Sequence, residues 1–307
     1  MSAVVERGGG GQPARVFHSG FVAVLGRPNV GKSTLVNRLV GRKVSIVSDH
    51  PQTTRRRISG VVSGDGFQIV LLDLPGFQRP FDSLTVRMQA TVDATVKEVD
   101  GALVMLAADE ALGGGDRFIA KAVLEARAPF VAVLNKVDAV SDGVAAARHA
   151  DAEALFGAGR VRAVSALRGD GVGGVADDLV ALLPEGPEYF PADAVSDQPL
   201  ELLVAELIRE QALRLTRDEV PHSVAVQVES ICERRDKPLV EIAADLIVEY
   251  ESQKAILIGK GGRTIKRLGS DARREIEAVV GAQVFLALRV KVRRRWRRDD
   301  ASVERLL

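Results

Sequence analysis

Residues 26–33, G-R-P-N-V-G-K-S, decide the fold, because they satisfy the pattern G-x-x-x-x-G-K-[ST]. An apolar run at residues 21–25 precedes them, and helical spacing begins near Lys32. Backbone N–H groups can surround a polyphosphate only where side chains leave room, so glycines are required. The stretch predicts a phosphate-binding loop between a strand and a helix N-terminus. The alternative is an ordinary glycine-rich turn.

Two side chains of this loop have expected roles at a nucleotide. Lys32 would contact the β and γ phosphates, and the Ser33 hydroxyl would bind Mg²⁺. Downstream, residues 73–76 read D-L-P-G at the end of another apolar run. There Asp73 would hold the Mg²⁺ through water, while the Gly76 N–H would sense the γ phosphate.

The polar loop Q-T-T-R at residues 52–55 lies between these two motifs. Its Thr54 is expected to complete the metal shell only when a triphosphate is present, as in an order–disorder switch. A solvated polar loop is the alternative for residues 51–57. Three successive arginines here are predicted to form a solvated basic loop rather than to assist the chemistry: Arg55, Arg56 and Arg57.

Residues 135–138, N-K-V-D, identify the base, because they follow a buried apolar run. The Asp138 carboxylate can accept hydrogen bonds from guanine N1–H and N2–H₂, whereas adenine offers neither donor. Ser165 and Ala166, after the next apolar run, would add backbone contacts to guanine O6. The motifs therefore predict a guanine nucleotide. The expected nucleotide-binding residues are Gly26, Arg27, Pro28, Asn29, Val30, Gly31, Lys32, Ser33, Thr34, Thr53, Thr54, Asp73, Leu74, Pro75, Gly76, Asn135, Lys136, Asp138, Ser165 and Ala166.

Length and composition place these motifs in a two-domain chain. The chain has 307 residues, 46% of them hydrophobic and 27% charged, which favours folded cores over disorder. The net charge is +1, but the residues from Lys254 onward hold 15 basic and 6 acidic side chains, a local +9 that leaves −8 elsewhere. The last sixth of the chain is therefore a candidate surface for a polyanion.

Targeting and redox signals are few. The single cysteine excludes an internal disulfide and fits a reducing cytosol. No uncharged apolar run approaches the ~18 residues of a membrane span. We therefore expect a cytoplasmic protein. Residues 1–16, with four consecutive glycines, are expected to be a disordered leader.

Composition also predicts where the domains divide. Residues 17–183 alternate buried strands, at 21–25, 67–72, 101–106, 130–134 and 161–164, with helical stretches. This order is typical of an α/β P-loop NTPase with a mainly parallel sheet flanked by helices. Residues 184–200 form a proline-rich linker. Residues 201–307 follow as a small α+β module in the order helix, strand, strand, helix, helix, strand.

The second module carries its own motif, G-x-x-G at residues 259–262. The bare pattern is weak, but a helix is expected on each side, with basic side chains clustered nearby. A backbone without Cβ atoms lets a nucleic-acid strand approach the N-terminus of the second helix. The module resembles a type II KH domain. A plain helix–helix turn is the alternative.

A basic run at residues 289–298 follows, with one aromatic side chain. Arginine planes and Trp296 could stack on unpaired bases while the charges neutralise phosphate. The alternative is a solvated charge run with Trp296 packed on the domain. Contact with anionic lipid at the inner face of the membrane is a secondary prediction. The expected RNA-binding residues are Gly259, Lys260, Gly261, Gly262, Arg263, Lys266, Arg293, Arg295, Trp296 and Arg297.

From about residue 21 to residue 300 the chain resembles the Era-type ribosome-assembly GTPases of the TrmE-Era-EngA group. The matching stretches are residues 26–33, 51–55, 73–76, 135–138 and 165–166. Leu74 departs from the threonine usual in that family, at a position whose side chain does no chemistry. The resemblance implies a GTPase that binds the 3′ end of small-subunit (16S) rRNA and assists rRNA processing and 30S subunit assembly.

The resemblance also implies slow intrinsic hydrolysis. Phe77 stands where Ras-like enzymes have a water-orienting glutamine, and a phenyl ring cannot make that hydrogen bond. In relatives the asparagine matching Asn29 helps bind K⁺, so Asn29 is a candidate K⁺ ligand or else stabilises the loop. With Lys32, Asp73 and Gly76 it completes the expected catalytic set.

Two other functions fit the same motifs. One is an RNA-binding adaptor that holds GTP without turnover. The other is a tRNA-modifying GTPase, although such enzymes lack this KH tail and need a further catalytic domain. The chain is expected to be a monomer whose two halves are coupled by the nucleotide.

Overall fold

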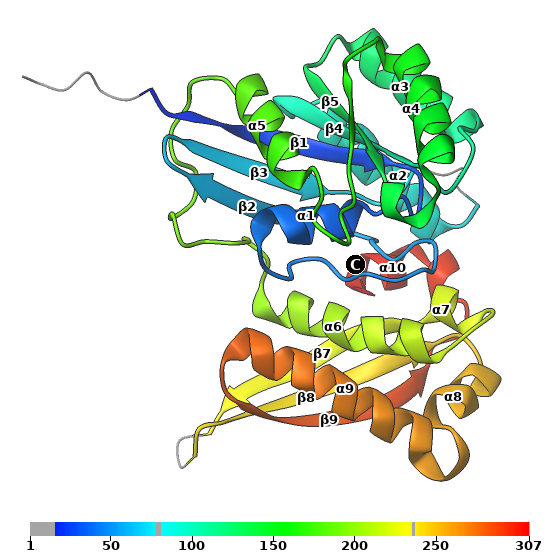
Figure 1. Ribbon diagram of the computed structural model, residues 1–307. Coiled ribbons are helices and arrows are strands. Elements are labelled where there is room, and N and C mark those ends of the chain that lie inside the picture. The colour runs from blue at the N-terminus through cyan, green and yellow to red at the C-terminus, as the bar shows by residue number, and fades with distance from the viewer. Residues whose placement is uncertain (1–15, 78–80, 235–236, 307) are drawn as a thin grey trace, which may run out of the picture.

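The structure is a computed structural model that describes residues 16–77, 81–234 and 237–306 of the chain. Figure 1 shows two lobes, one built around strands β1–β6 and the other around β7–β9, with α10 between them. Residues 1–15 of the predicted leader lie outside the described residues. No helix in the described part of the chain has the length and apolar character needed to cross a membrane.

The first lobe is a six-stranded sheet in the order β2-β3-β1-β4-β5-β6. All neighbouring strands are parallel except β2 and β3, which are antiparallel. This sheet confirms the predicted P-loop class. The strands are β1 (His18–Gly26), β2 (Ile58–Gly64), β3 (Phe67–Asp73), β4 (Gly101–Ala107), β5 (Phe130–Asn135) and β6 (Val161–Ala163).

Helices cover both faces of this sheet. On one face α1 (Lys32–Val40) and α5 (Val172–Leu182) share a core with side chains such as Val22, Leu71 and Val133. On the other face α2 (Ser83–Val96), α3 (Gly114–Ala126) and α4 (Asp142–Phe156) cover a core that includes Leu25 and Leu106. Because both faces are covered, the middle of each central strand is a continuous apolar run, such as residues 69–72 of β3.

Strand β2 is absent from the sequence prediction. It forms a hairpin with β3, and the turn between them contains Gly66 at φ 83°. The dipeptide Asp65-Gly66 is a strong signal for a two-residue hairpin turn. The two glycines and two serines in β2 hide its apolar pattern, so the turn was the better signal.

The proline-rich segment at residues 184–199 lies extended along the sheet of the first lobe. Ser19 N–H donates to Pro184 O (3.1 Å), and Val61 N–H donates to Val195 O (2.9 Å). Between these points the Gln68 amide accepts from the N–H groups of Tyr189 and Phe190 (2.8 and 2.9 Å). The segment is extended as expected, but its carbonyls and N–H groups bind it to the sheet.

The second lobe is a three-stranded sheet, β7-β8-β9, packed against α6 and α9. Strands β7 and β8 are antiparallel, whereas β9 runs parallel to β8. The order α6-β7-β8-α8-α9-β9 confirms the predicted KH module. Its elements are α6 (Leu200–Leu215), α7 (Val220–Ser223), β7 (Ala225–Glu233), β8 (Leu239–Val248), α8 (Glu251–Ile258), α9 (Arg263–Val280), β9 (Gln283–Val292) and α10 (Asp300–Leu306).

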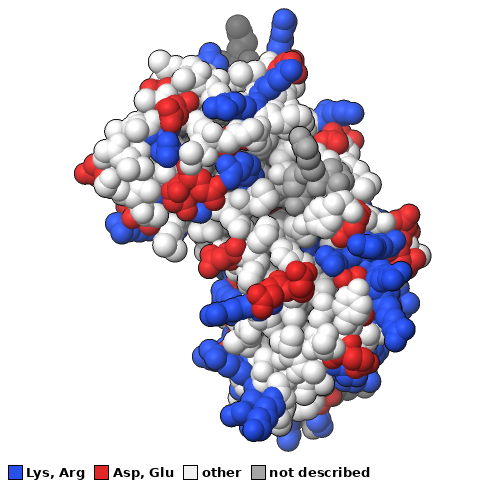
Figure 2. All heavy atoms as spheres, turned by 90° about the vertical axis from the view of Figure 1, so that its right-hand side faces the viewer, with Lys and Arg blue, Asp and Glu red and all other residues white. Residues whose placement is uncertain are grey.

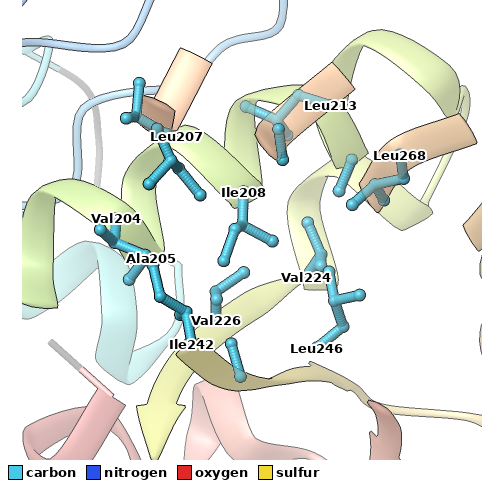
Figure 3. Packing of buried hydrophobic residues seen from close by; sticks show 14 of the residues in the cluster. Val204, Ala205, Leu207, Ile208, Leu213, Val224, Val226, Ile242, Leu246 and Leu268 are labelled. Atoms are coloured by element: carbon cyan, nitrogen blue, oxygen red, sulfur yellow. The ribbon is translucent and has the colours of Figure 1, made fainter. Parts of the chain in front are cut away.

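Two cores join the lobes. Figure 3 shows Ile208 of α6 next to Val226 of β7, and Leu207 of α6 and Ile46 of the first lobe belong to the same cluster. A smaller cluster joins Leu84 and Met88 of α2 to side chains of β7, β8, α10 and Trp296. The lobes therefore share buried apolar contacts.

Candidate nucleotide site and nucleic-acid interface

The phosphate-binding loop joins β1 to α1 as the motif predicts. Gly31 is the N-cap of α1 at φ 97°, and no side chain of the described residues caps this helix. A Cβ on Gly31 would lie 2.2 Å from Asn135 Nδ2, so only glycine fits. The first N–H groups of α1 are thus available to an anion, and the helix dipole favours one there.

The Lys32 side chain lies back along the loop. It is 6% exposed, and its Nζ donates to Gly26 O (3.1 Å) and Arg27 O (2.9 Å). Burial lowers the pKa of Lys32 to about 8, while the Asp73 carboxylate opposes the shift. A polyphosphate beside this ammonium would favour its charged form.

Ser33, Thr54 and Asp73 converge at one point. Ser33 Oγ donates to Asp73 Oδ2 (2.7 Å) and lies 3.0 Å from Thr54 Oγ1. Asp73 is fully buried, and its Oδ1 has no hydrogen-bonding partner among the described residues. Burial raises the pKa of Asp73, against the hydrogen bond from Ser33 and the charge of Lys32. A cluster of oxygen ligands with an unpaired buried carboxylate oxygen fits Mg²⁺.

The base end of the site is held by Asn135. Its Nδ2 donates to Val30 O (2.9 Å), and its Oδ1 accepts from Ala166 N–H (2.9 Å). One amide therefore joins the phosphate loop, the end of β5 and the 165–166 segment. Asp138 follows with a side chain 12% exposed, 3.8 Å from Arg168 Nε. Ser165 Oγ accepts from Arg168 N–H (3.0 Å), which orders the loop beside it.

Many of the predicted nucleotide-binding residues line one cavity of about 300 Å³ at the end of the sheet. The side chains of Val30 and Leu74 are buried in the protein core, so only their backbone can reach a nucleotide. The cavity is lined by residues of the phosphate loop, α1, the loop after α1 and the strand ends: Pro28, Asn29, Gly31, Lys32, Ser33, Thr34, Ile46, Val47, Ser48, Asp49, Gln52, Thr53, Thr54, Gly76, Glu110 and Lys136.

The residues near the expected γ phosphate are closely packed. A Cβ on Gly76 would lie 2.7 Å from Pro28 N, so this glycine allows the two loops to approach. Asn29 stands at φ 63°, and its Nδ2 donates to Asp49 O (2.7 Å). The Phe77 ring packs edge-on against Phe118, with centroids 5.7 Å apart.

Arg55 is buried in the contact between the lobes, which contradicts the predicted solvated basic loop. It is 4% exposed, and its guanidinium donates to the carbonyls of Val224 (2.7 Å), His222 (3.0 Å) and Pro221 (3.2 Å). The guanidinium also lies 5.8 Å from the Trp296 ring centroid. Burial, with Arg209 alongside, lowers the pKa of Arg55 to about 9. Arg57 is exposed as expected.

Helix α6 of the second lobe contacts the same loop, residues 43–57, which we call the switch loop. Arg209 is 2% exposed and donates through Nη2 to Thr53 O. Glu210 is fully buried and accepts from Val47 N–H (3.1 Å) and from Lys43. Sequence reasoning missed these residues, because α6 shows no motif and its contacts cross more than 150 positions.

The G-x-x-G segment lies between α8 and α9 as predicted. Gly259, Gly261 and Gly262 have φ of 71°, 61° and 75°. A Cβ on Gly259 would meet Thr264 Oγ1 at 2.1 Å. Three basic side chains of this region are exposed: Lys260, Arg263 and Lys266. The segment thus exposes backbone and positive charge at the start of a helix, as phosphate contacts require.

Trp296 is fully buried, so the prediction that it stacks on unpaired bases is wrong. Its indole Nε1 donates to Ser223 O (2.8 Å), and its ring packs in the cluster between the lobes. Arg297 binds Glu249 (2.8 Å) and lies 3.9 Å from Asp82 of the first lobe. Burial of the large indole ring stabilises this contact, and its N–H keeps a hydrogen-bonding partner there. These two residues hold the lobes together.

The structure separates the expected RNA residues into two groups. Arg293 and Arg295 follow β9, and Arg293 N–H donates to Val248 O (2.8 Å) shortly before α8, whereas the G-x-x-G segment follows α8. This helix has eight residues, or about 12 Å. Figure 2 shows Lys and Arg side chains gathered over the second lobe. A groove of about 340 Å³ between α9 and β9, lined by Lys266, Arg273 and Phe285 among others, was missed by the sequence analysis.

Fold and site define a P-loop GTPase that carries a KH domain. Residues 21–136 match the family described as 50S ribosome-binding GTPase, and residues 219–297 match the KH domain family. GTPase Era of Mycobacterium tuberculosis is 45% identical over 295 residues, which cover 94% of this chain and 98% of that protein. GTPase Era of Mycobacterium avium is 47% identical with the same coverage. The chain belongs to the GTPase Era family.

Two solved structures of this family are similar along nearly the whole chain. One is a variant of Aquifex aeolicus Era bound to GDP·AlF4⁻, at 36% identity and a TM-score of 0.90 over 94% of this chain and 99% of that one. The other is Era in complex with MgGDPNP and nucleotides 1506–1542 of 16S ribosomal RNA, with the same identity and TM-score over 94% of this chain and 98% of that chain.

Proposed function

We propose that this GTPase binds GTP and GDP with Mg²⁺ in the cavity at the end of the first sheet. The observation that carries the proposal is the convergence of Ser33, Thr54 and Asp73 on one buried point beside Lys32. Mg²⁺ bound there would neutralise phosphate charge. Asp138 would select guanine, because its carboxylate matches two donors that adenine lacks.

The chain's own groups can stabilise the negative charge of the phosphates, but the Phe77 side chain cannot orient or deprotonate the attacking water. The N-terminus of α1 and the Lys32 ammonium would bind the phosphate oxygens, and the Gly76 N–H would contact the γ phosphate. The hydrophobic Phe77 side chain is held against Phe118. We therefore expect slow turnover unless a further positive charge is supplied.

A bound K⁺ would supply that charge, with Asn29 as a ligand. Asn29 lines the cavity, and its amide nitrogen is already fixed by Asp49 O, which leaves the amide oxygen to face a cation. Hydrolysis is expected to be faster in KCl than in NaCl at equal ionic strength, measured as phosphate release. Equal rates in both salts would contradict the role of K⁺.

The second lobe is proposed to bind small-subunit rRNA near its 3′ end and to assist rRNA processing and 30S subunit assembly. The matching Era structure holds nucleotides 1506–1542 of 16S ribosomal RNA. The matched family is described by the 50S subunit, but the whole-chain similarity to the 16S complex favours the small subunit. The exposed G-x-x-G segment and the basic second lobe fit an RNA strand.

The two lobes are proposed to work as one switch. Residues of the switch loop are buried against the second lobe through Arg55 and Ile46, so a change in this loop at hydrolysis changes contacts with the KH domain. By linkage, RNA binding must alter nucleotide affinity by the same factor as the nucleotide alters RNA affinity. If the separated GTPase lobe binds nucleotide, and the separated KH lobe binds RNA, with the same affinity as in the full chain, this coupling is contradicted.

The RNA proposal is tested with a synthetic RNA of the 16S 3′ end. The double variant K260A/R263A should weaken binding and lower the salt slope by about two, because each phosphate contact releases about one counterion. A matched control is K121A/R127A on the first lobe, where both side chains are exposed. GTP affinity should stay unchanged in both variants. Unaltered RNA affinity of K260A/R263A would contradict the proposal.

Multiple-turnover phosphate release would exclude the adaptor that only holds GTP. Cytoplasmic location, a monomeric state and weak contact of the basic C-terminal segment with anionic lipid stay predictions. A tRNA-modifying role finds no support in a match that covers 94% of the chain and nearly all of its Era relatives.

A further inference from the structure

A buried ion pair of the KH domain reaches into the switch loop. Arg209 of α6 donates to Glu206 through Nε (2.9 Å) and Nη2 (2.5 Å). Burial disfavours the charged carboxylate, but Arg209, Arg56 and Arg55 outweigh it and hold the pKa of Glu206 below its usual value. These two hydrogen bonds to Glu206 hold the guanidinium in one orientation on helix α6.

The same guanidinium also binds the backbone of the switch loop. Its Nη2 donates to Thr53 O, and its Nη1 is buried without a hydrogen-bonding partner in the described part of the chain. Burial of an arginine nitrogen is costly unless it is compensated. The hydrogen bonds to Glu206 and to Thr53 O compensate part of this cost and hold the Arg209 side chain at the carbonyl.

The carbonyl that Arg209 binds belongs to the peptide before Thr54. Thr54 Oγ1 lies 3.0 Å from Ser33 Oγ and 3.5 Å from Asp73 Oδ2, where the metal is proposed. Fixing the Thr53 carbonyl fixes the plane of the peptide bond and hence the start of Thr54. A side chain of the second lobe is therefore one peptide away from the proposed metal ligands of the first.

A second contact of α6 supports this orientation. Glu210, one residue further along the helix, accepts from Val47 N–H (3.1 Å) and from Lys43 at the start of the switch loop. The helix thus binds the switch loop at Lys43 and Val47 as well as at Thr53. The Thr53 hydroxyl is fixed separately, since it donates to His50 O (2.6 Å).

We propose that Arg209 is a positioning residue that holds Thr54 toward Ser33 and Asp73, so that the KH domain completes the metal site of the GTPase. The inference rests on the metal site proposed above. It assigns to α6 a direct part in binding GTP with Mg²⁺, separate from any part in binding RNA.

The test compares Mg²⁺ dependence in the full chain of the wild type, Arg209→Gln and Arg209→Lys. The Mg²⁺ concentration for half-maximal GTP hydrolysis should rise about tenfold or more in R209Q, the effect of losing one charge-assisted hydrogen bond. GDPNP affinity should fall with it, while GDP affinity stays within about twofold, because Thr54 engages only with the γ phosphate. R209K keeps one charged donor, so its Mg²⁺ requirement should lie between those of the wild type and R209Q.

Arg217→Gln is the matched control, because it removes an exposed arginine just after the same helix and should leave all these values unchanged. An unshifted Mg²⁺ dependence in R209Q, or equal losses for GDP and GDPNP, would overturn the proposal. If R209Q does not fold, an unshifted R209K overturns it. Absence of Mg²⁺-dependent hydrolysis in the wild type would instead refute the proposed function itself.

Discussion

The two ends of the proposed nucleotide site differ in which lobe supports them. At the base end, Asn135 joins Val30 to Ala166, and all three residues belong to the GTPase lobe. At the phosphate end, Arg209 of the KH lobe binds the switch loop, and Arg55 of that loop is buried among KH carbonyls. The proposed base end thus lies within one domain, whereas the phosphate end receives contacts from both.

This difference separates two properties of the protein. In the proposed function, nucleotide identity would depend on short-range geometry that the GTPase lobe forms by itself. The response to the γ phosphate would depend on the switch loop, which contacts from both lobes hold, and such contacts can differ between nucleotide states. Specificity and switching can therefore be altered one at a time.

The largest expected effect is at the base end. In Asp138→Asn the carboxylate that would accept two guanine N–H groups is lost, so GTP affinity should fall about 100-fold or more. Calorimetric titration with GTP and Mg²⁺ measures the change, and Asp193→Asn, an exposed aspartate in the proline-rich segment, is the control. If D138N binds GTP within threefold of the wild-type affinity, the proposal that Asp138 recognises the base is contradicted.

The phosphate end is tested by Arg55→Met. The substitution leaves the carbonyls of Val224, Pro221 and His222 without this donor, the first two in buried hydrogen bonds, so stability should fall by about 2–4 kcal/mol. Trp296 is the only tryptophan and lies beside Arg55, so urea unfolding followed by its fluorescence reports on this contact. Arg57→Met, at an exposed position, should stay within about 0.5 kcal/mol of the wild type. Equal effects of the two variants would show that the contact does not stabilise the protein.

A smaller effect is expected from the ionisation of Lys32. Burial lowers its pKa from 10.5 to about 8, so the stability contributed by its neutral form is fully present above pH 10.5 and is lost as pH falls from there through 8. A phosphate site needs the charged form, so GTP affinity should fall about tenfold between pH 7 and pH 9. Titrations across this range measure it, and Lys32→Arg, which stays charged, should not show the decrease. A flat profile in the wild type would show that Lys32 is charged throughout.

The smallest expected effect concerns Trp296. Trp296→Phe loses the hydrogen bond to Ser223 O and some volume, at a cost of about 1 kcal/mol in thermal stability. Its affinity for the 16S 3′-end RNA should remain within twofold, since the ring is buried. A large loss of RNA affinity with unchanged stability would restore the stacking role that the structure contradicts.

Sequence patterns predicted most of the fold, because the signals were local. The buried strands, the G-x-x-x-x-G-K-S loop and the α–β–β–α–α–β order of the second module each follow from spacing within about 20 residues. Strand β2 was missed where glycine and serine interrupt the apolar pattern. The short helices α7 and α10 were also missed, since four and seven residues carry little periodic signal.

Side chains that bridge the lobes could not be assigned in this way. Trp296 and Arg297 belong to a basic run that is typical of nucleic-acid binding, and Arg55 belongs to a polar loop. Their partners lie between 48 and 241 residues away along the chain, at Glu249, Ser223 and Trp296. No periodicity or local composition reports such contacts.

The sequence by itself determined the chemistry proposed for the nucleotide site, since the glycines, Lys32, Ser33, Asp73 and Asp138 lie in segments at or just after the carboxyl ends of strands, which parallel pairing brings to one edge of the sheet. Only the tertiary structure decided which charged and aromatic side chains face solvent and which join the lobes. The physical reason is that burial depends on what packs against a residue from elsewhere in the chain. An arginine in a basic run is a ligand for RNA or an interdomain contact according to the carbonyls and carboxylates that the fold places beside it.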